Sequence, residues 1–364
     1  MNISGLNRVN SILIFIMLVL FGLYFGASVL IPLTFAIFLA ALILPLALFL
    51  ETKWKMSKPA SSFWCTLVIF IGLGALLFLL VHQLGIVLKE LIDTRDVIVN
   101  FLKDLQQSIV GKTGIFESQD VDVFPADFTS VLSTIREELT SFLTNISDIL
   151  LKLLVVHVYL FLLLLNRDKL VEFLLMYTSE GKKDQTLKII QKTRKVSYHY
   201  FWGRLKVMSL LAVMYFITFS IYELPFTGLL VLFGTLITVI PFIGPFISGL
   251  LPILVMFIFG DTALEIISFA VIVMIIQLIE SYVLEPIIIG EEVQQSPLFV
   301  ILAIFTGGLL WGGAGLILFV PIFAILKIIF DNSEPLKPVG YLMGYERHGA
   351  KEGILDKLKR KLSR

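Results

Sequence analysis

Two carboxylates and one amide occupy a long apolar stretch in the last third of the chain. Gln277 and Glu280 are three residues apart and therefore share one face of a helix, and Glu285 directly precedes Pro286. An ionisable side chain in a membrane segment is costly and usually faces protein or a water-filled cavity. The spacing favours contact with a substrate or cation, or a proton-binding site. The alternative is that both carboxylates lie near the inner end of the helix and meet water at the lipid headgroups.

Proline and glycine interrupt the same apolar third at two places. The first break contains Pro241, Gly244 and Pro245. The second contains five glycines within nine residues: Gly307, Gly308, Gly312, Gly313 and Gly315. Irregular backbone in a bilayer is tolerated only where protein or water satisfies its polar groups. We therefore expect the site at these breaks, where helix N-termini would favour an anion and unwound carbonyls a cation. Close packing of small residues between helices is the alternative reading of the glycines.

Composition defines the class of protein. Of 364 residues, 57% are hydrophobic and 16% are charged, whereas a soluble chain carries about 25% charged residues. The net charge of +1 gives no basic field for nucleic acid. Cys65 is the single cysteine, and no phosphate loop, HExxH motif, nucleophile elbow or Cys/His metal spacing is present. We therefore expect a polytopic membrane protein without enzymatic activity, cofactor or metal.

The apolar runs predict an all-α protein with about eight transmembrane helices and a C-terminal re-entrant or broken-helix hairpin. The spans are expected at 10–29, 30–50, 63–88, 149–165, 205–222, 227–240, 246–259 and 262–284, with a turn near Pro32 between the first two. Leu298–Leu310 contains 13 residues. It reaches about 20 Å as helix, less than the hydrocarbon core of about 30 Å. A hairpin over 298–330 with its tip at Trp311–Gly315 is therefore expected.

Polar segments divide these spans into five parts. Apolar residues at helical spacing on both sides of an acidic stretch, 111–127, predict an amphipathic helical hairpin outside the membrane. The expected parts are N-terminal transmembrane helices (1–88), the extracytoplasmic hairpin (89–148), two transmembrane helices with a basic amphipathic segment (149–222), a broken-helix transport core (223–330) and a basic tail (331–364).

Basic residues predict the orientation. When the predicted spans are followed in order, all basic segments fall on the same side of the membrane. These segments are Lys53, Lys55 and Lys58, the cluster at 167–206 and the tail. The positive-inside rule makes that side cytoplasmic and places both termini there. Two smaller features have local explanations. Thr262 and Glu265 fit a capping box, and His157, in the middle of a span, is expected to bond a backbone carbonyl.

Several spaced motifs resemble the autoinducer-2 exporter family, also called PerM-like permeases. These are VIPFIGP at 239–245, QLIESYVLEPIIIG at 277–290, Ser296-Pro297-Leu298, and the glycine-rich ending up to Val320-Pro321. The resemblance implies a secondary transporter of the bacterial cytoplasmic membrane and a homo-oligomer, a pentamer by family likeness. Pro286, Gly290, Pro297 and Pro321 are the expected hinges of the last hairpin.

We therefore expect export of a small polar solute, such as autoinducer-2-like signals, by alternating access. The partners are membrane lipid and the small-molecule or ion substrate. A sodium/proton antiporter using Glu280 or Glu285 is the alternative, and a non-transporting membrane scaffold is the second alternative.

Overall fold

The computed structural model describes residues 3–93, 139–260, 262–289 and 295–344, together with residues 134 and 137. In these parts the chain is helical, and six helices are long and apolar enough to cross a membrane, with three shorter apolar helices beside them. The protein is an all-α polytopic membrane protein, as predicted. Its helices are α1 (Ile3–Phe25), α2 (Ala27–Lys53), α3 (Lys58–Asp93), α6 (Ile146–Leu165), α7 (Arg167–Met176), η1 (Glu180–Lys182), α8 (Lys183–Ile221), α9 (Thr227–Ile237), α10 (Ile243–Phe259), α11 (Ala263–Ile279), the π-helix η2 (Glu280–Ile289), α12 (Pro297–Asp331), η4 (Glu334–Leu336) and α13 (Lys337–Met343).

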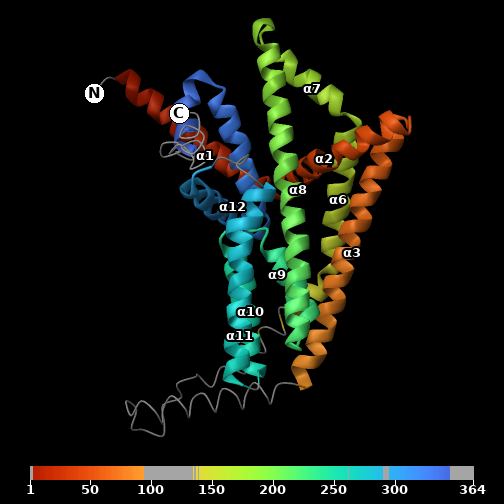
Figure 1. Ribbon diagram of the computed structural model, residues 1–364. Coiled ribbons are helices and arrows are strands. Elements are labelled where there is room, and N and C mark those ends of the chain that lie inside the picture. The colour runs from red at the N-terminus through yellow and green to blue at the C-terminus, as the bar shows by residue number, and fades with distance from the viewer. Residues whose placement is uncertain are drawn as a thin grey trace, which may run out of the picture.

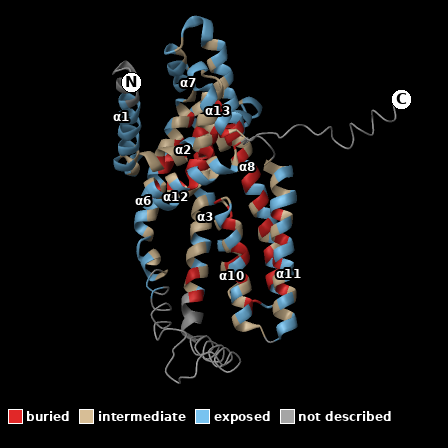
Figure 2. Ribbon diagram, turned by 90° about the vertical axis from the view of Figure 1, so that its left-hand side faces the viewer, coloured by how far each residue is buried: buried red, intermediate tan, exposed pale blue. Residues whose placement is uncertain are grey.

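The helices pack in two groups on either side of α8 (Figure 1). One group consists of α2, α3 and α6, whose core includes Cys65 and Leu160. The other surrounds α8 with α9, α10 and α11, and its core includes Leu211, Phe219 and Phe269. A third cluster of buried residues joins α12 to α2 and α8. Side chains on the outer faces of these groups are largely exposed (Figure 2), as expected where lipid replaces water.

Helices α1 and α2 are the arms of an open V (Figures 1 and 2). The sequence predicts the turn near Pro32, but the chain bends at Gly26, and Pro32 lies inside α2. A side-chain carbon at Gly26 would lie 2.6 Å from the Gly22 carbonyl oxygen, so the bend suits glycine. Pro32 is in the second turn of α2, where its ring removes one intrahelical hydrogen bond.

The basic loops gather at one end of the molecule. The α2–α3 turn, α7, the start of α8 and α13 all lie at the upper end in Figure 1. Lys58 bonds Asp168, and Arg167 bonds Glu51, which ties this turn to the start of α7. The hydrogen bond from Lys58 lowers the pKa of Asp168 below its usual value. This grouping agrees with the predicted common side of the basic loops.

The structure describes only a portion of two of the predicted parts, the amphipathic hairpin and the basic tail. Helix α3 continues to Asp93, and helix is present again from residue 139 into α6. The rest of the predicted amphipathic hairpin, and the tail beyond residue 344, lie outside the described residues.

Candidate functional site

The first break joins α9 and α10 as a helical hairpin. Helix α9 contains 11 residues and is about 16 Å long, half the hydrocarbon thickness. The two separate spans predicted here are therefore arms that turn back on each other. Phe242, at the turn, has a φ of 63°. A side-chain carbon at Gly244 would collide with the Ile237 carbonyl, which explains glycine at that position.

Local hydrogen bonds satisfy the backbone of this turn. Ile243 N–H bonds the Pro241 carbonyl at 2.7 Å, and Gly244 N–H bonds the Ile240 carbonyl at 2.8 Å. The Thr238 hydroxyl donates to the Thr235 carbonyl at 2.8 Å. The turn is thus compact although Phe242 is exposed, and the carbonyls of Pro241 and Ile240 are occupied by these bonds in this conformation. Pro245 lies in the first turn of α10, where proline is tolerated.

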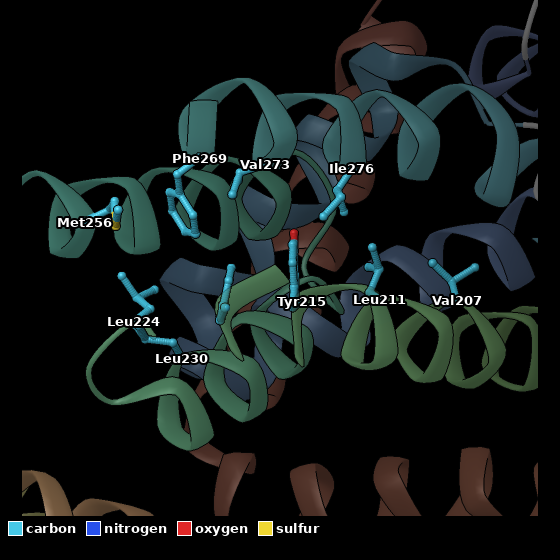
Figure 3. Close-up of a cluster of buried hydrophobic side chains, with 10 residues drawn as sticks. Val207, Leu211, Tyr215, Leu224, Leu230, Met256, Phe269, Val273 and Ile276 are labelled. Carbon is cyan, nitrogen blue, oxygen red and sulfur yellow. The ribbon is translucent and has the colours of Figure 1, made fainter. Parts of the chain in front are cut away.

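A polar triad connects three helices beside this hairpin. The Gln277 amide on α11 donates to the Tyr215 hydroxyl on α8 at 2.6 Å and to the Ser248 hydroxyl on α10 at 3.0 Å. The two hydroxyls lie 3.4 Å apart. Figure 3 shows the Tyr215 hydroxyl pointing from α8 towards the helix that carries Val273 and Ile276. Gly249 makes room for the amide, because a side-chain carbon there would lie 3.2 Å from Gln277 Nε2.

A buried ionic cluster lies where α8 meets η2. The Glu280 side chain is 0% exposed, and Arg204 Nη2 lies 3.9 Å from its Oε1. Arg204 Nη1 instead bonds Glu285, whose side chain is 37% exposed. Neither Glu280 oxygen has a hydrogen-bond partner among the described residues, nor do Nε and Nη2 of Arg204. The cluster therefore contains acceptors and donors that face each other without bonding.

The π-helix η2 positions both carboxylates of this cluster. The sequence predicts that the helix ends before Pro286, but it continues to Ile289 as η2. A π turn closes hydrogen bonds from i to i+5, and such segments occur frequently at functional sites. Packing against α8 holds it, because a side-chain carbon at Gly203 would lie 3.2 Å from the Ile288 carbonyl oxygen. Glu285 therefore lies on a helix rather than in extended backbone.

The second break is the predicted hairpin of α12. Gly312 has φ 56° and ψ −138° and separates two arms. The arms cross so closely that a side-chain carbon at Gly315 would collide with the Gly307 carbonyl. A side-chain carbon at Gly308 would lie 3.0 Å from Leu316 Cδ2, whereas one at Gly312 or Gly313 would meet no neighbouring atom within 4 Å. The glycines of the two arms thus serve close packing, and Gly312 supplies the turn.

Protein donors satisfy broken backbone near this hairpin tip. The Trp311 indole donates to the Leu23 carbonyl at 2.8 Å, close to the bend at Gly26. Among the predicted hinges, Pro297 begins α12, and Pro321 is buried within it. Gly290 lies outside the described residues. The Gln295 amide donates to the Val320 carbonyl at 3.3 Å, one residue before Pro321.

Comparison with known proteins identifies the family. A family model described as AI-2E family transporter matches residues 13–334, which include both C-terminal breaks, the triad and the ionic cluster. The chain belongs to the AI-2E transporter family. It is therefore a multi-pass membrane transporter.

Three proteins with sequences similar to this chain are named as transport proteins. YueF and YrrI of Bacillus subtilis carry provisional names as transport proteins. YueF is 27% identical over 57% of this chain and 59% of its own length, and YrrI is 24% identical over 83% and 86%. The AI-2 transport protein TqsA of Escherichia coli is 24% identical over 90% of this chain and 93% of its own. The chain thus covers less than two thirds of YueF but most of the other two.

Sequence reasoning missed Tyr215, Ser248 and the role of Arg204. Arg204 was counted with the basic cytoplasmic cluster, yet its side chain is 5% exposed. It lies 17 residues before the end of α8 at Ile221, about 26 Å along the helix and so within the hydrocarbon thickness. The signal was available, because Arg204, Leu211 and Tyr215 recur at helical spacing on one face.

The smaller expectations have clear outcomes. Glu265 N–H bonds the Thr262 hydroxyl at 3.2 Å, which confirms the cap. His157 Nδ1 lies 2.6 Å from the Leu153 carbonyl oxygen, as expected for a histidine bonded to backbone. Within the described ranges, no group of three or more His, Cys, Asp or Glu side chains could hold a metal ion.

Proposed function

We propose that this protein is a secondary transporter that exports a small polar solute, such as an autoinducer-2-like signal, by alternating access. The observation that carries the proposal is the triad of Tyr215, Ser248 and Gln277, which brings polar groups from three helices together inside an apolar core. The hydroxyl and amide groups of the triad can break their hydrogen bonds to each other and form hydrogen bonds with the hydroxyls of a solute instead. A hydrogen bond of this kind contributes about 0.5–1.5 kcal/mol.

The two broken hairpins are the proposed moving parts. The α9–α10 hairpin carries Ser248 and packs on α8, which carries Tyr215. A displacement of this hairpin would separate Ser248 from Gln277 and open the triad from one side. The α12 hairpin packs on α2 and α8 instead, and we propose that Pro297 and Pro321 hinge it. Pathway roles for the residues of the breaks and for the two carboxylates follow from the same proposal.

We also propose the bacterial cytoplasmic membrane as the location, with both termini cytoplasmic. The shared end of the basic loops supports this orientation through the positive-inside rule. A homo-oligomer, with the pentamer as the expectation from family likeness, belongs to the same proposal. Native mass spectrometry of the detergent-solubilised protein tests the oligomer, and a monomer under all conditions would contradict it.

A sodium/proton antiporter is the second candidate. The burial of Glu280 without a donor favours it, because such a carboxyl can exchange a proton for a cation. Vesicles with an internal sodium indicator test it. If an imposed proton gradient moves no sodium, this candidate fails.

Efflux from proteoliposomes loaded with autoinducer-2 tests the leading candidate. We expect Ser248→Ala and Gln277→Leu each to slow efflux by about tenfold, which corresponds to about 1.4 kcal/mol. Ser209→Ala is the matched control, because Ser209 is an exposed serine of α8 that bonds only its own helix. If wild-type efflux is no faster than efflux from loaded liposomes without protein, export of this solute is contradicted and a scaffold is favoured. Wild-type rates in both triad variants would contradict the site.

A further inference from the structure

We propose that Glu280 is a reversible proton-binding site and that Arg204, shared between Glu280 and Glu285, transmits the presence of the proton to η2. The inference rests on the proposed transport function for its purpose, since it supplies the coupling of a proton to that transport. The binding of the proton itself rests on the geometry of the cluster alone.

The environment of Glu280 favours a proton on its carboxyl group. Its side chain is 0% exposed, and no donor among the described residues bonds either oxygen. An isolated carboxylate without water or hydrogen bonds has a large desolvation cost, which protonation removes. Protonation would therefore lower the cost of burying Glu280 in this arrangement.

Arg204 has two possible carboxylate partners and bonds one of them. It bonds Glu285 through Nη1, while its Nη2 lies 3.9 Å from Glu280 Oε1. A charge-assisted hydrogen bond has a length of about 2.7–2.9 Å, so a shift of about 1 Å would form one with Glu280. The donors on Nε and Nη2 have no other acceptor among the described residues. The guanidinium is thus ready for the second partner.

The charges of the cluster explain why the proton decides the partner. With Glu280 protonated, the positive charge of Arg204 and the negative charge of Glu285 balance. When Glu280 releases its proton to water, one guanidinium faces two carboxylates. Among the described residues, Tyr200 and Tyr215 of α8 are titratable groups that interact with the cluster. Neither tyrosine contributes a positive charge, so the ionised Glu280 attracts the guanidinium of Arg204.

The competition for Arg204 acts on η2 and reaches the triad. Glu280 and Glu285 lie on η2, and Gln277 lies three residues before Glu280 on α11. Transfer of the guanidinium to Glu280 frees Glu285, which is already partly exposed, and exchanges one bond between α8 and η2 for another that lies nearer to Gln277. Proton release would therefore move the ionic contact between α8 and η2 towards the end that carries Gln277.

Difference infrared spectroscopy of the purified full-length protein, with the pH stepped upwards from about 6, where ordinary carboxyl groups are already ionised, tests this inference. We expect the wild type to lose the C=O stretch of a protonated carboxyl group. This band should be absent from Glu280→Gln, and in Glu285→Gln it should be lost at lower pH than in the wild type, because Arg204 then has Glu280 alone as its partner in the cluster. A wild type without such a band, or a band that persists in Glu280→Gln, overturns the proposal.

Arg204→Gln tests the shared cation and covers the case in which Glu280→Gln does not fold. Without the cation, the midpoint of band loss should move to higher pH by about one unit or more. An unchanged midpoint overturns the role of Arg204. Because the experiment contains no solute, failure of autoinducer-2 efflux leaves its result standing, and absence of the band leaves the efflux result standing.

Discussion

Three glycines at the tip of α12 should respond to alanine in three different ways. Gly315→Ala places a methyl group against the Gly307 carbonyl, a rigid backbone obstacle. Overpacking of this kind costs about 1–3 kcal/mol. The better helix propensity of alanine offsets up to about 1 kcal/mol. A net loss of about 1–2 kcal/mol in the free energy of unfolding is expected.

The neighbouring glycines are controls for the two causes. The methyl group of Gly313→Ala would meet no neighbouring atom within 4 Å, and Gly313 has no positive φ. The change should therefore leave the free energy of unfolding unchanged or raise it by up to about 1 kcal/mol. Gly312→Ala also has open space, but its φ of 56° and ψ of −138° are strained for alanine, which costs about 1–3 kcal/mol. Gly312→Ala thus tests backbone strain without a steric clash.

Equilibrium unfolding in mixed micelles of mild detergent and SDS is the assay. The expected order of stability places Gly313→Ala at or above the wild type, with Gly312→Ala and Gly315→Ala below it. Gly307→Ala combined with Gly315→Ala should cost less than the sum of the single changes, because both break one contact. Equal losses in Gly313→Ala and Gly315→Ala would refute the crossing of the arms through these glycines.

Three further changes have defined outcomes in the same unfolding assay. Arg204→Met should cost up to about 3 kcal/mol, because it leaves the half-buried carboxylate of Glu285 without its cation; no loss would contradict the cluster. Trp311→Phe should cost about 1–3 kcal/mol, because it leaves the Leu23 carbonyl without its donor, whereas Trp64→Phe, at an exposed position, should cost little. Equal losses would contradict a stabilising role of the bond between Trp311 and Leu23. The hydrogen bond from Lys58 lowers the pKa of Asp168 in the folded state. The carboxylate therefore stabilises the fold at pH values above the usual pKa of an aspartate. This stabilisation is lost as the pH falls through the lower pKa of the folded state. Asp168→Asn should remove that part of the pH dependence, a small part because the side chain is 77% exposed; a profile identical to the wild type would contradict it.

Features set by local sequence could be predicted. The cap at Thr262 and the α12 hairpin follow from residue type, spacing and helix length alone. The first break is different, because its two arms are predicted as separate spans and the structure shows them as a hairpin of α9 and α10. Pro286 shows where local rules fail, because packing against Gly203 supports a π-helix that a proline rule would end.

Partners from distant helices could not be predicted in the same way. Gln277 was found as a polar residue in an apolar helix, but Ser248 looked like an ordinary small residue of a membrane helix. Arg204 was hidden by its neighbours in sequence, since it follows a run of basic residues that lie at the membrane surface. The register of α8 against η2, which decides that Arg204 faces Glu280, is a property of the packed structure.

Alternating exposure of the triad tests the central claim most directly. Cys65 is the single cysteine, so Cys65→Ser provides a background in which Ser248→Cys can be labelled with a membrane-impermeant thiol reagent from either side of reconstituted vesicles. Leu160→Cys, in the closed core of α6, should label from neither side. We predict that Ser248→Cys reacts from both sides and that autoinducer-2 slows both reactions. Reaction from one side only, or from neither, would contradict transport through this site.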